Sequence, residues 1–200
     1  MTICLFQGTF NPPHNGHLQV AKFVLQTCNF DKIIFIPAAK PPHKTLNENE
    51  NEALHRLNMT KLLVGDYSCF YVSDIEFRRK TLSYTYTTIK ELYKNENLTE
   101  KPYFIIGDDA FLKIESWYHS SELKDLINFI VLPRDDDYDE KKYKELEKKG
   151  YNYKRLNMPE IDISSTRIRE LCQKGLPLDG LTSKEVEKYI YEHNLYRNVD

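Results

Sequence analysis

Two short apolar runs on either side of a helical pattern constrain the fold more than any other feature of the chain. The first run is Thr2–Phe6 and the second is Lys32–Ile36, which is nearly all apolar and stops at Pro37. A continuous apolar run of this kind is typical of a strand buried on both faces of a parallel sheet. Between the runs, residues 16–29 carry apolar side chains at helical spacing. The first 36 residues are therefore expected to form a β-α-β unit.

The alternation of strand-like and helical patterns continues to the end of the chain. The fold is therefore expected to be α/β, a single-domain, Rossmann-like, doubly wound parallel sheet over residues 1–200, with a C-terminal helical part at about 164–200. Residues 37–50 are rich in Pro, Lys, Asn and Glu, so we expect a mobile loop there. The further expected strands are Cys69–Ile75, Tyr103–Ile106, Phe129–Leu132 and Tyr153–Leu156, and the further helices are Ala53–Leu63, Tyr86–Tyr93, the solvated segment Asp135–Lys149, Ser165–Lys174 and Ser183–Asn194.

Charge and cysteine content narrow the classes of function. The 28 Lys and Arg against 30 Asp and Glu leave a net charge of −2, which provides no basic field for a nucleic-acid partner. The four cysteines are far apart without a Cys-x-x-Cys pair, so they are expected to be buried, reduced thiols. No signal peptide or membrane span is apparent, and a cytoplasmic protein with no membrane partner is expected.

The segment Gly8–His17, with the sequence G-T-F-N-P-P-H-N-G-H, follows the first strand and opens the first helix. In an open α/β sheet this is where ligands bind, and glycines next to a helix N-terminus favour an anion. His14 and His17 are three residues apart, so both imidazoles can face the same anion. Two alternatives stay open: a Gly/Pro turn with helix-capping histidines, or a metal site that adds His43 or His55, although no acidic or Cys ligand has suitable spacing.

A second polar segment, Ile163–Arg169, contains three hydroxyl side chains and an arginine at the start of a predicted helix. A single Ser or Thr here would cap the helix. Three hydroxyls, free backbone amides and a guanidinium together form a second site suited to a polyphosphate.

These two segments resemble the signatures G-x-F-x-P-x-H-x-G-H and I-S-S-T-x-I-R of the nucleotidyltransferase α/β phosphodiesterase superfamily. The resemblance implies that His17 donates to the α-phosphate of ATP while His14 binds the neighbouring phosphates. It leaves Arg167 at an unspecified position that is expected to face solvent. The other residues that it assigns to the ATP phosphates are Gly8, Thr9, Phe10, Gly16, Ser164, Ser165, Thr166 and Arg169.

Further segments resemble the bacterial-type nicotinate-nucleotide adenylyltransferases, and the matches extend over nearly the whole chain. They are K-P-P-H-K at 40–44, L-S-Y-T-Y-T at 82–87, I-I-G-D-D-A at 105–110, W-Y at 117–118 and L-P-R at 132–134. Asp108 departs from this family's pattern, because a small residue is usual there. Its carboxylate would repel a neighbouring phosphate unless it faced solvent or helped to hold Mg²⁺, so its role stays open. The resemblance assigns Lys44, Thr85, Tyr86 and Trp117 to the pyridine mononucleotide, and Gly107, Asp109 and Arg134 to adenosine and ribose.

The activity that this resemblance implies is adenylyl transfer from ATP to nicotinate mononucleotide, giving nicotinate adenine dinucleotide and pyrophosphate in NAD biosynthesis. Mg²⁺ is expected to arrive with ATP, without a dedicated metal site in the protein. Three alternatives stay open: nicotinamide mononucleotide as acceptor, another acceptor of the superfamily such as phosphopantetheine, and a nucleotide-binding regulator without catalysis. Contact with phosphate is expected to raise the pKa of both histidines, so activity should fall when they become neutral.

Overall fold

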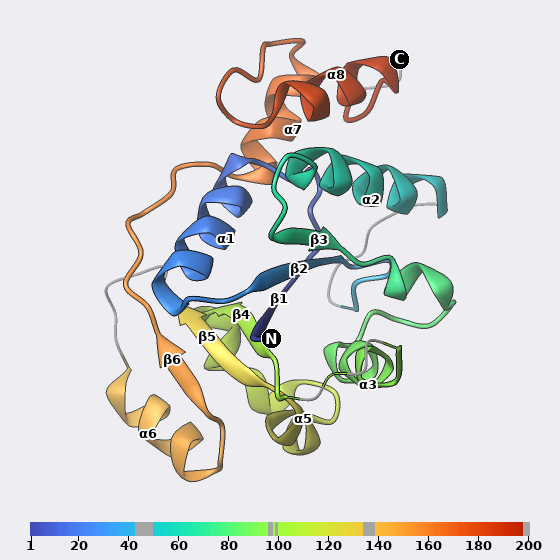
Figure 1. Cartoon of the computed structure of the whole chain (residues 1–200). Coiled ribbons are helices and arrows are strands. Elements are labelled where there is room, and N and C mark those ends of the chain that lie inside the picture. The colour runs from blue at the N-terminus through green and yellow to red at the C-terminus, as the bar shows by residue number, and fades with distance from the viewer. Residues whose placement is uncertain (43–49, 96–97, 99, 134–138, 198–200) are drawn as a thin grey trace.

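Six parallel strands form one sheet in the order β3-β2-β1-β4-β5-β6 (Figure 1). The structure is a computed structural model that describes residues 1–42, 50–95, 98, 100–133 and 139–197. The order reverses at β1, whose neighbours are β2 on one side and β4 on the other. A doubly wound sheet opens a crevice at such a reversal, at the carboxyl ends of the strands. The strands are β1 (Ile3–Gly8), β2 (Lys32–Pro37), β3 (Phe70–Val72), β4 (Tyr103–Gly107), β5 (Asn128–Leu132) and β6 (Tyr153–Arg155).

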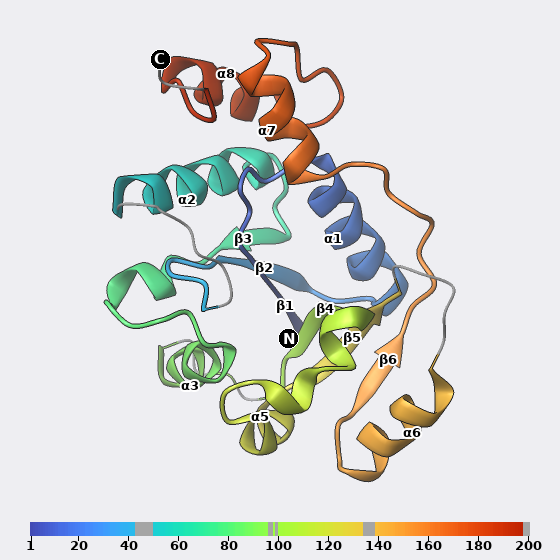
Figure 2. The same ribbon diagram turned by 180° about the vertical axis from the view of Figure 1, so that it is seen from behind.

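Helices cover both faces of the sheet, as Figures 1 and 2 show from opposite sides. Successive residues of β1 point to opposite faces, so that Cys4 packs in one apolar core and Leu5 in the other. The first core includes side chains of α1 (Asn15–Cys28), α2 (Glu50–Val64), α7 (Ser165–Gln173) and α8 (Lys184–Glu192). The second core includes side chains of α3 (Thr85–Asn95), α4 (Asp108–Phe111), α5 (Ser120–Leu126), α6 (Glu140–Lys148) and the 3₁₀ turn η2 (Ile114–Ser116), and it also packs against the 3₁₀ turn η1 (Ile75–Arg78).

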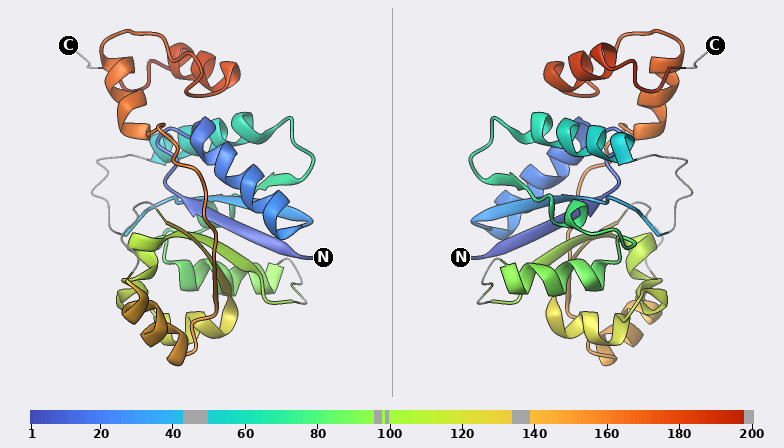
Figure 3. Two further views of the ribbon diagram at one scale, coloured as in Figure 1. Left: turned by 90° about the vertical axis from the view of Figure 1, so that its left-hand side faces the viewer. Right: turned by 90° about the vertical axis from the view of Figure 1, so that its right-hand side faces the viewer.

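The segment 156–164 joins β6 to α7 and runs from one helical layer to the other, as the orange trace in Figure 3 shows. It has no regular secondary structure, and Met158, Ile161 and Ile163 on it line the main cleft. The path brings the C-terminal helices above α1 and α2 (Figure 3). Residues near the end of the chain are thereby placed close to the first loop.

The α/β class and the parallel sheet are confirmed, and the main differences lie in short elements. Of the expected strand Cys69–Ile75, only Phe70–Val72 forms a strand, and Ile75 begins the 3₁₀ turn η1. The short helices α4 and α5 were not predicted, since neither is long enough to show a helical period. Helix α6 was expected to be solvated, yet Tyr143 and Leu146 are buried and attach it to the second core. Most of the expected loop at 37–50 lies outside the described residues.

No helix within the described ranges is long and apolar enough to cross a membrane. All four cysteines are free thiols, as the sequence predicts. Two of them, Cys4 and Cys172, are buried, and burial raises the pKa of both thiols.

Candidate active site

A cleft of about 1440 Å³ opens at the carboxyl ends of β1 and β4, where the strand order reverses. Gly8 ends β1 and Gly107 ends β4, and both line the cleft. Pro133 follows β5, and it lines the cleft together with segment 156–164 and the first turn of α7. The sequence-predicted residues that line this cleft are Gly8, Thr9, Phe10, His14, Gly16, His17, Thr85, Gly107, Trp117, Ser164, Ser165, Thr166 and Arg169.

The two histidines are held by the first turn of α1. The Nδ1 atom of His17 accepts the backbone N–H of His14 at 3.2 Å, which satisfies one of the amides before the helix. In this arrangement Nδ1 carries no proton, so neutral His17 carries its proton on Nε2. The two rings pack together with centroids 3.7 Å apart. His17 is therefore oriented as a hydrogen-bond donor through Nε2 even without a net charge.

His14 is only 7% exposed, and its Nδ1 atom is buried without a hydrogen-bond partner. Burial removes the water that would stabilise the imidazolium and lowers the pKa of His14 to about 4. The expectation from the sequence was a raised pKa in contact with phosphate, and in this ligand-free protein the direction is the opposite. A buried, unpaired ring nitrogen in a cleft indicates a place where a ligand atom can bind.

Phe10 fixes the shape of the loop between β1 and α1. Its backbone has φ = 49°, a left-handed conformation that is uncommon for a bulky residue, and its ring is buried. The ring meets His17 edge-on with centroids 4.9 Å apart. It also lies so close to Gly8 that a Cβ atom there would be 3.0 Å from it. The segment Gly8–His17 therefore includes a buried aromatic ring, packed against His17 and Gly8, besides its polar groups.

Helix α7 brings the second polar segment against this loop. Ser164 caps the helix by accepting the N–H of Arg167 at 3.2 Å. Ser165 donates to the carbonyl of Pro12 at 2.9 Å, and Arg169 donates to the carbonyl of Asn11 at 2.7 Å. The exposed side chain of Arg167 pairs with Asp162 at 3.5 Å, in agreement with its expected position at the surface. The two segments are far apart in the sequence and form one continuous polar wall.

Aromatic side chains occupy the opposite end of the cleft. Trp117 meets Phe104 edge-on, and Tyr84 stacks on Tyr118 with centroids 4.5 Å apart. All four rings line the cleft, as does Thr85 at the start of α3. The ring of Tyr86 instead stacks on His119 of the turn before α5, outside the cleft. Tyr86 can therefore contribute its backbone to a ligand here, but its side chain belongs to the α3–α5 contact.

The remaining predicted residues do not meet in the cleft. Asp109 is exposed and does not line it. Asp108, whose role the sequence left open, is 8% exposed and so does not face solvent, and its Oδ1 accepts the N–H of Asp109 at 2.8 Å. Since Asp108 is also outside the cleft lining, it has no position from which to hold a metal there. Lys44 and Arg134 lie outside the described residues.

The alternative of a metal site at His14 and His17 gains no support from the described residues. Across the described part of the chain, no group of three His, Cys, Asp or Glu side chains could hold a metal ion. His55 accepts or donates a hydrogen bond at 2.9 Å with Tyr189 of α8, and its ring packs against His193. It is thus part of the α2–α8 contact, and His43 is not described.

A buried arginine that supports the cleft from behind was not predicted from the sequence. Arg56 of α2 is 1% exposed and donates to the carbonyls of Thr9 at 2.8 Å, Ala38 at 2.6 Å and Ala39 at 3.3 Å. It joins the loops after β1 and β2. The only signal in the sequence is an arginine among the apolar positions of a helix, which cannot be distinguished from a surface arginine without the fold.

Fold and site together define a nucleotide-binding α/β transferase. The cytidylyltransferase-like family matches residues 5–171. A probable nicotinate-nucleotide adenylyltransferase from Caldicellulosiruptor bescii is 37% identical over 201 residues, covering 98% of this chain and 100% of the relative. The nicotinate-nucleotide adenylyltransferase of Bacillus subtilis is 38% identical over 199 residues, covering 98% of each chain. The chain belongs to the nicotinate-nucleotide adenylyltransferases, within the cytidylyltransferase-like family.

Solved structures support the same fold. A Plasmodium falciparum nicotinic acid mononucleotide adenylyltransferase complexed with NaAD superimposes with a TM-score of 0.78 at 24% identity. The match covers 98% of this chain and 97% of that one.

Proposed function

We propose that this chain transfers the adenylyl group of ATP to nicotinate mononucleotide and releases pyrophosphate. The observation that carries the proposal is the convergence of His14 and His17 with the first turn of α7 on one wall of a cleft whose other end is aromatic. Phosphates are recognised by the polar wall, and a planar pyridine ring by aromatic faces. A cleft with both features fits two nucleotides placed end to end.

In the proposed reaction the phosphate of the mononucleotide attacks the α-phosphorus of ATP in line with the departing pyrophosphate. This nucleophile is already an anion near neutral pH, so neither a covalent intermediate nor a strong base is required. Nε2–H of His17 donates to an oxygen of the α-phosphate as negative charge builds up there. His14, Ser165 and Arg169 bind the phosphates that leave as pyrophosphate.

The remaining contacts follow the cleft. The loop Gly8–Phe10 and Gly16 bring backbone amides close to the phosphates, with Ser164 and Thr166 at the start of α7. In this arrangement Gly107 faces the ribose of ATP. Asp109 lies outside the cleft lining, so its carboxylate reaches the ribose only after a rearrangement. Trp117 and the backbone around Thr85 and Tyr86 bind the pyridine ring and its carboxylate. Lys44 and Arg134 remain assigned by resemblance.

Magnesium enters as part of the MgATP substrate. Apart from the carboxylate of Glu160, the polar groups of the described cleft lining are imidazoles, hydroxyls, amides and a guanidinium, which suit phosphate oxygens rather than a hard cation. This donor set fits an ion that is held by the ATP phosphates and by water. The ion supplies charge neutralisation on those phosphates, while orientation comes from the protein. The four free cysteines suit the reducing cytoplasm, the compartment that we propose.

Pyrophosphate release in the presence of MgATP tests the proposal. Nicotinate mononucleotide, nicotinamide mononucleotide and phosphopantetheine are offered in parallel, with the His17→Asn variant as control. We expect turnover with nicotinate mononucleotide and a large loss in the variant. Turnover with phosphopantetheine alone would refute the acceptor, and ATP binding without turnover for any acceptor would identify a regulator.

A further inference from the structure

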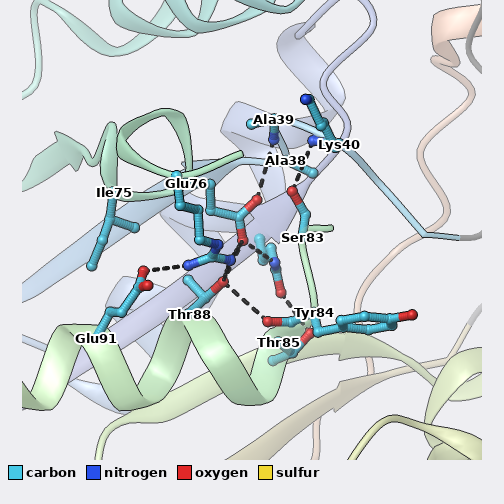
Figure 4. A network of polar contacts seen from close by, with 12 residues as sticks. Ala38, Ala39, Lys40, Ile75, Glu76, Ser83, Tyr84, Thr85, Thr88 and Glu91 are labelled. Atoms are coloured by element: carbon cyan, nitrogen blue, oxygen red, sulfur yellow. Dashed lines mark hydrogen bonds and ion pairs between the residues drawn. The ribbon is translucent and has the colours of Figure 1, made fainter. Parts of the chain in front are cut away.

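Glu76 of η1 is a fully buried acidic residue just behind the aromatic end of the cleft, and it is 0% exposed (Figure 4). Its Oε1 atom accepts hydrogen bonds from Nε2 of Gln7 at 2.6 Å and from the hydroxyl of Thr88 at 2.5 Å. Its Oε2 atom accepts the backbone N–H of Ala39 at 3.2 Å. Arg79 lies 3.6 Å from Oε1 and compensates the charge. A buried carboxylate with this many donors holds its surroundings in one arrangement.

The partners of Glu76 come from three segments that frame the cleft. Gln7 lies at the end of β1, Ala39 follows β2, and Thr88 is in the first turns of α3. The loop after β2 is also tied to the start of α3, because the N–H of Lys40 donates to the hydroxyl of Ser83 and the N–H of Ser83 donates to the carbonyl of Lys40, both at 2.8 Å. Figure 4 shows the contacts of Glu76 above Thr85, with the contact between Lys40 and Ser83 beside them.

The polarity of this network sets the orientation of Gln7 and Thr85. Because Nε2 of Gln7 donates to Glu76, its Oε1 atom faces the other way and accepts the hydroxyl of Thr85 at 2.7 Å. Both Gln7 and Thr85 line the cleft. The hydroxyl proton of Thr85 is thereby directed at Gln7, and the first turn of α3 is fixed against β1.

We propose that Glu76 is a positioning residue for the acceptor nucleotide: by fixing Gln7, the loop after β2 and the start of α3, it holds the subsite of the pyridine mononucleotide ready for binding. It does so without touching the ligand. The inference rests on the proposed function, since it assigns the aromatic end of the cleft to the acceptor. Glu76 bonds directly to Gln7, Ala39 and Thr88, and its link to the loop after β1 runs only indirectly, through Ala39 and Arg56, so the acceptor should respond more strongly than ATP to a change at Glu76.

The variant Glu76→Gln tests this inference with almost no change in volume. One oxygen becomes an NH₂ group, which must face either the N–H of Ala39 or the NH₂ of Gln7. Either the loop after β2 loses its anchor or the amide of Gln7 reverses toward Thr85. The matched control is Glu91→Gln, because Glu91 also forms an ion pair with Arg79 but lies at the far side of the network.

Steady-state kinetics with both substrates varied give the main readout, and calorimetric binding of nicotinate mononucleotide and thermal unfolding accompany it. We expect Glu76→Gln to raise the KM and Kd for the mononucleotide roughly tenfold, the size of one lost charge-assisted hydrogen bond, and to leave the KM for ATP within about twofold. Glu91→Gln should leave both KM values within about twofold. If Glu76→Gln does not fold, Gln7→Leu, which removes the link to Thr85 and keeps Glu76, should give the same split.

Equal losses for both substrates, or no change for the mononucleotide in a folded variant, would overturn the role of Glu76. Failure of the proposed function appears elsewhere, in the wild-type protein. If the wild-type protein neither binds nor adenylylates nicotinate mononucleotide, the proposed function is refuted. The role of Glu76 then falls as well, because it rests on that function.

Discussion

The imidazole rings of His14 and His17 lie against each other, with centroids 3.7 Å apart and planes inclined by 34°. Two positive charges at this separation repel strongly unless an anion binds next to both. Without a ligand, burial keeps His14 neutral and the backbone N–H of His14 occupies Nδ1 of His17. The pair is thus arranged to take up charge when phosphate arrives.

The variant His17→Asn should distinguish the role of Nδ1 of His17 from the role of its Nε2. The amide oxygen of Asn can accept the N–H of His14 in place of Nδ1, but nothing replaces Nε2. We expect kcat to fall by ~10²–10³, the typical cost of one lost transition-state donor, with little change in melting temperature. The companion variant His17→Ala loses the capping bond too, and should cost about 1 kcal/mol of stability more than Asn. Normal turnover by a folded His17→Asn would contradict the role of Nε2.

Binding of MgATP should be coupled to proton uptake by His14. The pKa of His14 is about 4 in the free protein, so the ring is neutral at pH 6. A bound phosphate favours the imidazolium and raises this pKa, so a proton is taken up on binding. Calorimetric titration at pH 6 in buffers of different ionisation enthalpy measures the number of protons. The variant His14→Asn should lose the uptake, and the same binding enthalpy in every buffer for the wild type would exclude it.

The ligand-free protein should lose stability as the solution is acidified. The pKa of His14 is lowered from 6.5 to about 4 on folding, so between these pH values the unfolded chain binds a proton that the folded one excludes. The stability from this residue is complete above 6.5 and is lost as the pH falls to about 4, on the order of 2–3 kcal/mol. Urea unfolding at several pH values measures it. A variant His14→Asn with an unchanged pH dependence would show that other groups are responsible.

Gly16→Ala should disturb His14 directly. A Cβ atom at position 16 would lie 2.9 Å from Nδ1 of His14 and 3.1 Å from Ile161, so the ring must move. Overpacking of this kind costs about 1–3 kcal/mol, and we expect a higher KM for ATP as well. The control is Gly65→Ala, whose new Cβ would be 3.3 Å from the nearest atom and far from the cleft lining. Equal effects of the two variants on ATP binding would contradict the argument.

Arg56→Met should destabilise the fold and loosen the phosphate loop. Loss of this side chain leaves the buried carbonyl of Ala38 and the partly buried carbonyl of Thr9 without its hydrogen bonds, which costs roughly 3 kcal/mol. The control is Arg78→Met, because Arg78 is exposed and pairs with exposed Asp74, a pair that contributes about 0.5 kcal/mol. Chemical denaturation compares the two. Equal stabilities would show that Arg56 is not needed to hold the loops.

A candidate site can be predicted from the sequence when its residues lie within one short segment of the chain. Gly8–His17 follows a strand and opens a helix, so the features on which its proposed phosphate binding rests are local and visible in the sequence. The same holds for Ser164–Arg169, whose hydroxyls and amides belong to one helix end. Tyr86 shows what a local motif does not contain, because the resemblance assigns the residue to the mononucleotide but does not reveal that its ring stacks on His119 outside the cleft.

The sequence by itself determined the α/β class, the two polar segments that we propose bind phosphate, and the family, because apolar periodicity and contiguous motifs are properties of short stretches of chain. Only the tertiary structure decided that these segments share one wall, through Arg169 and the carbonyl of Asn11. It also decided that Glu76 lies behind the acceptor end of the cleft and that Asp108 is buried. Burial and contacts between distant segments depend on how helices and strands pack, and the local pattern of residues does not contain that information.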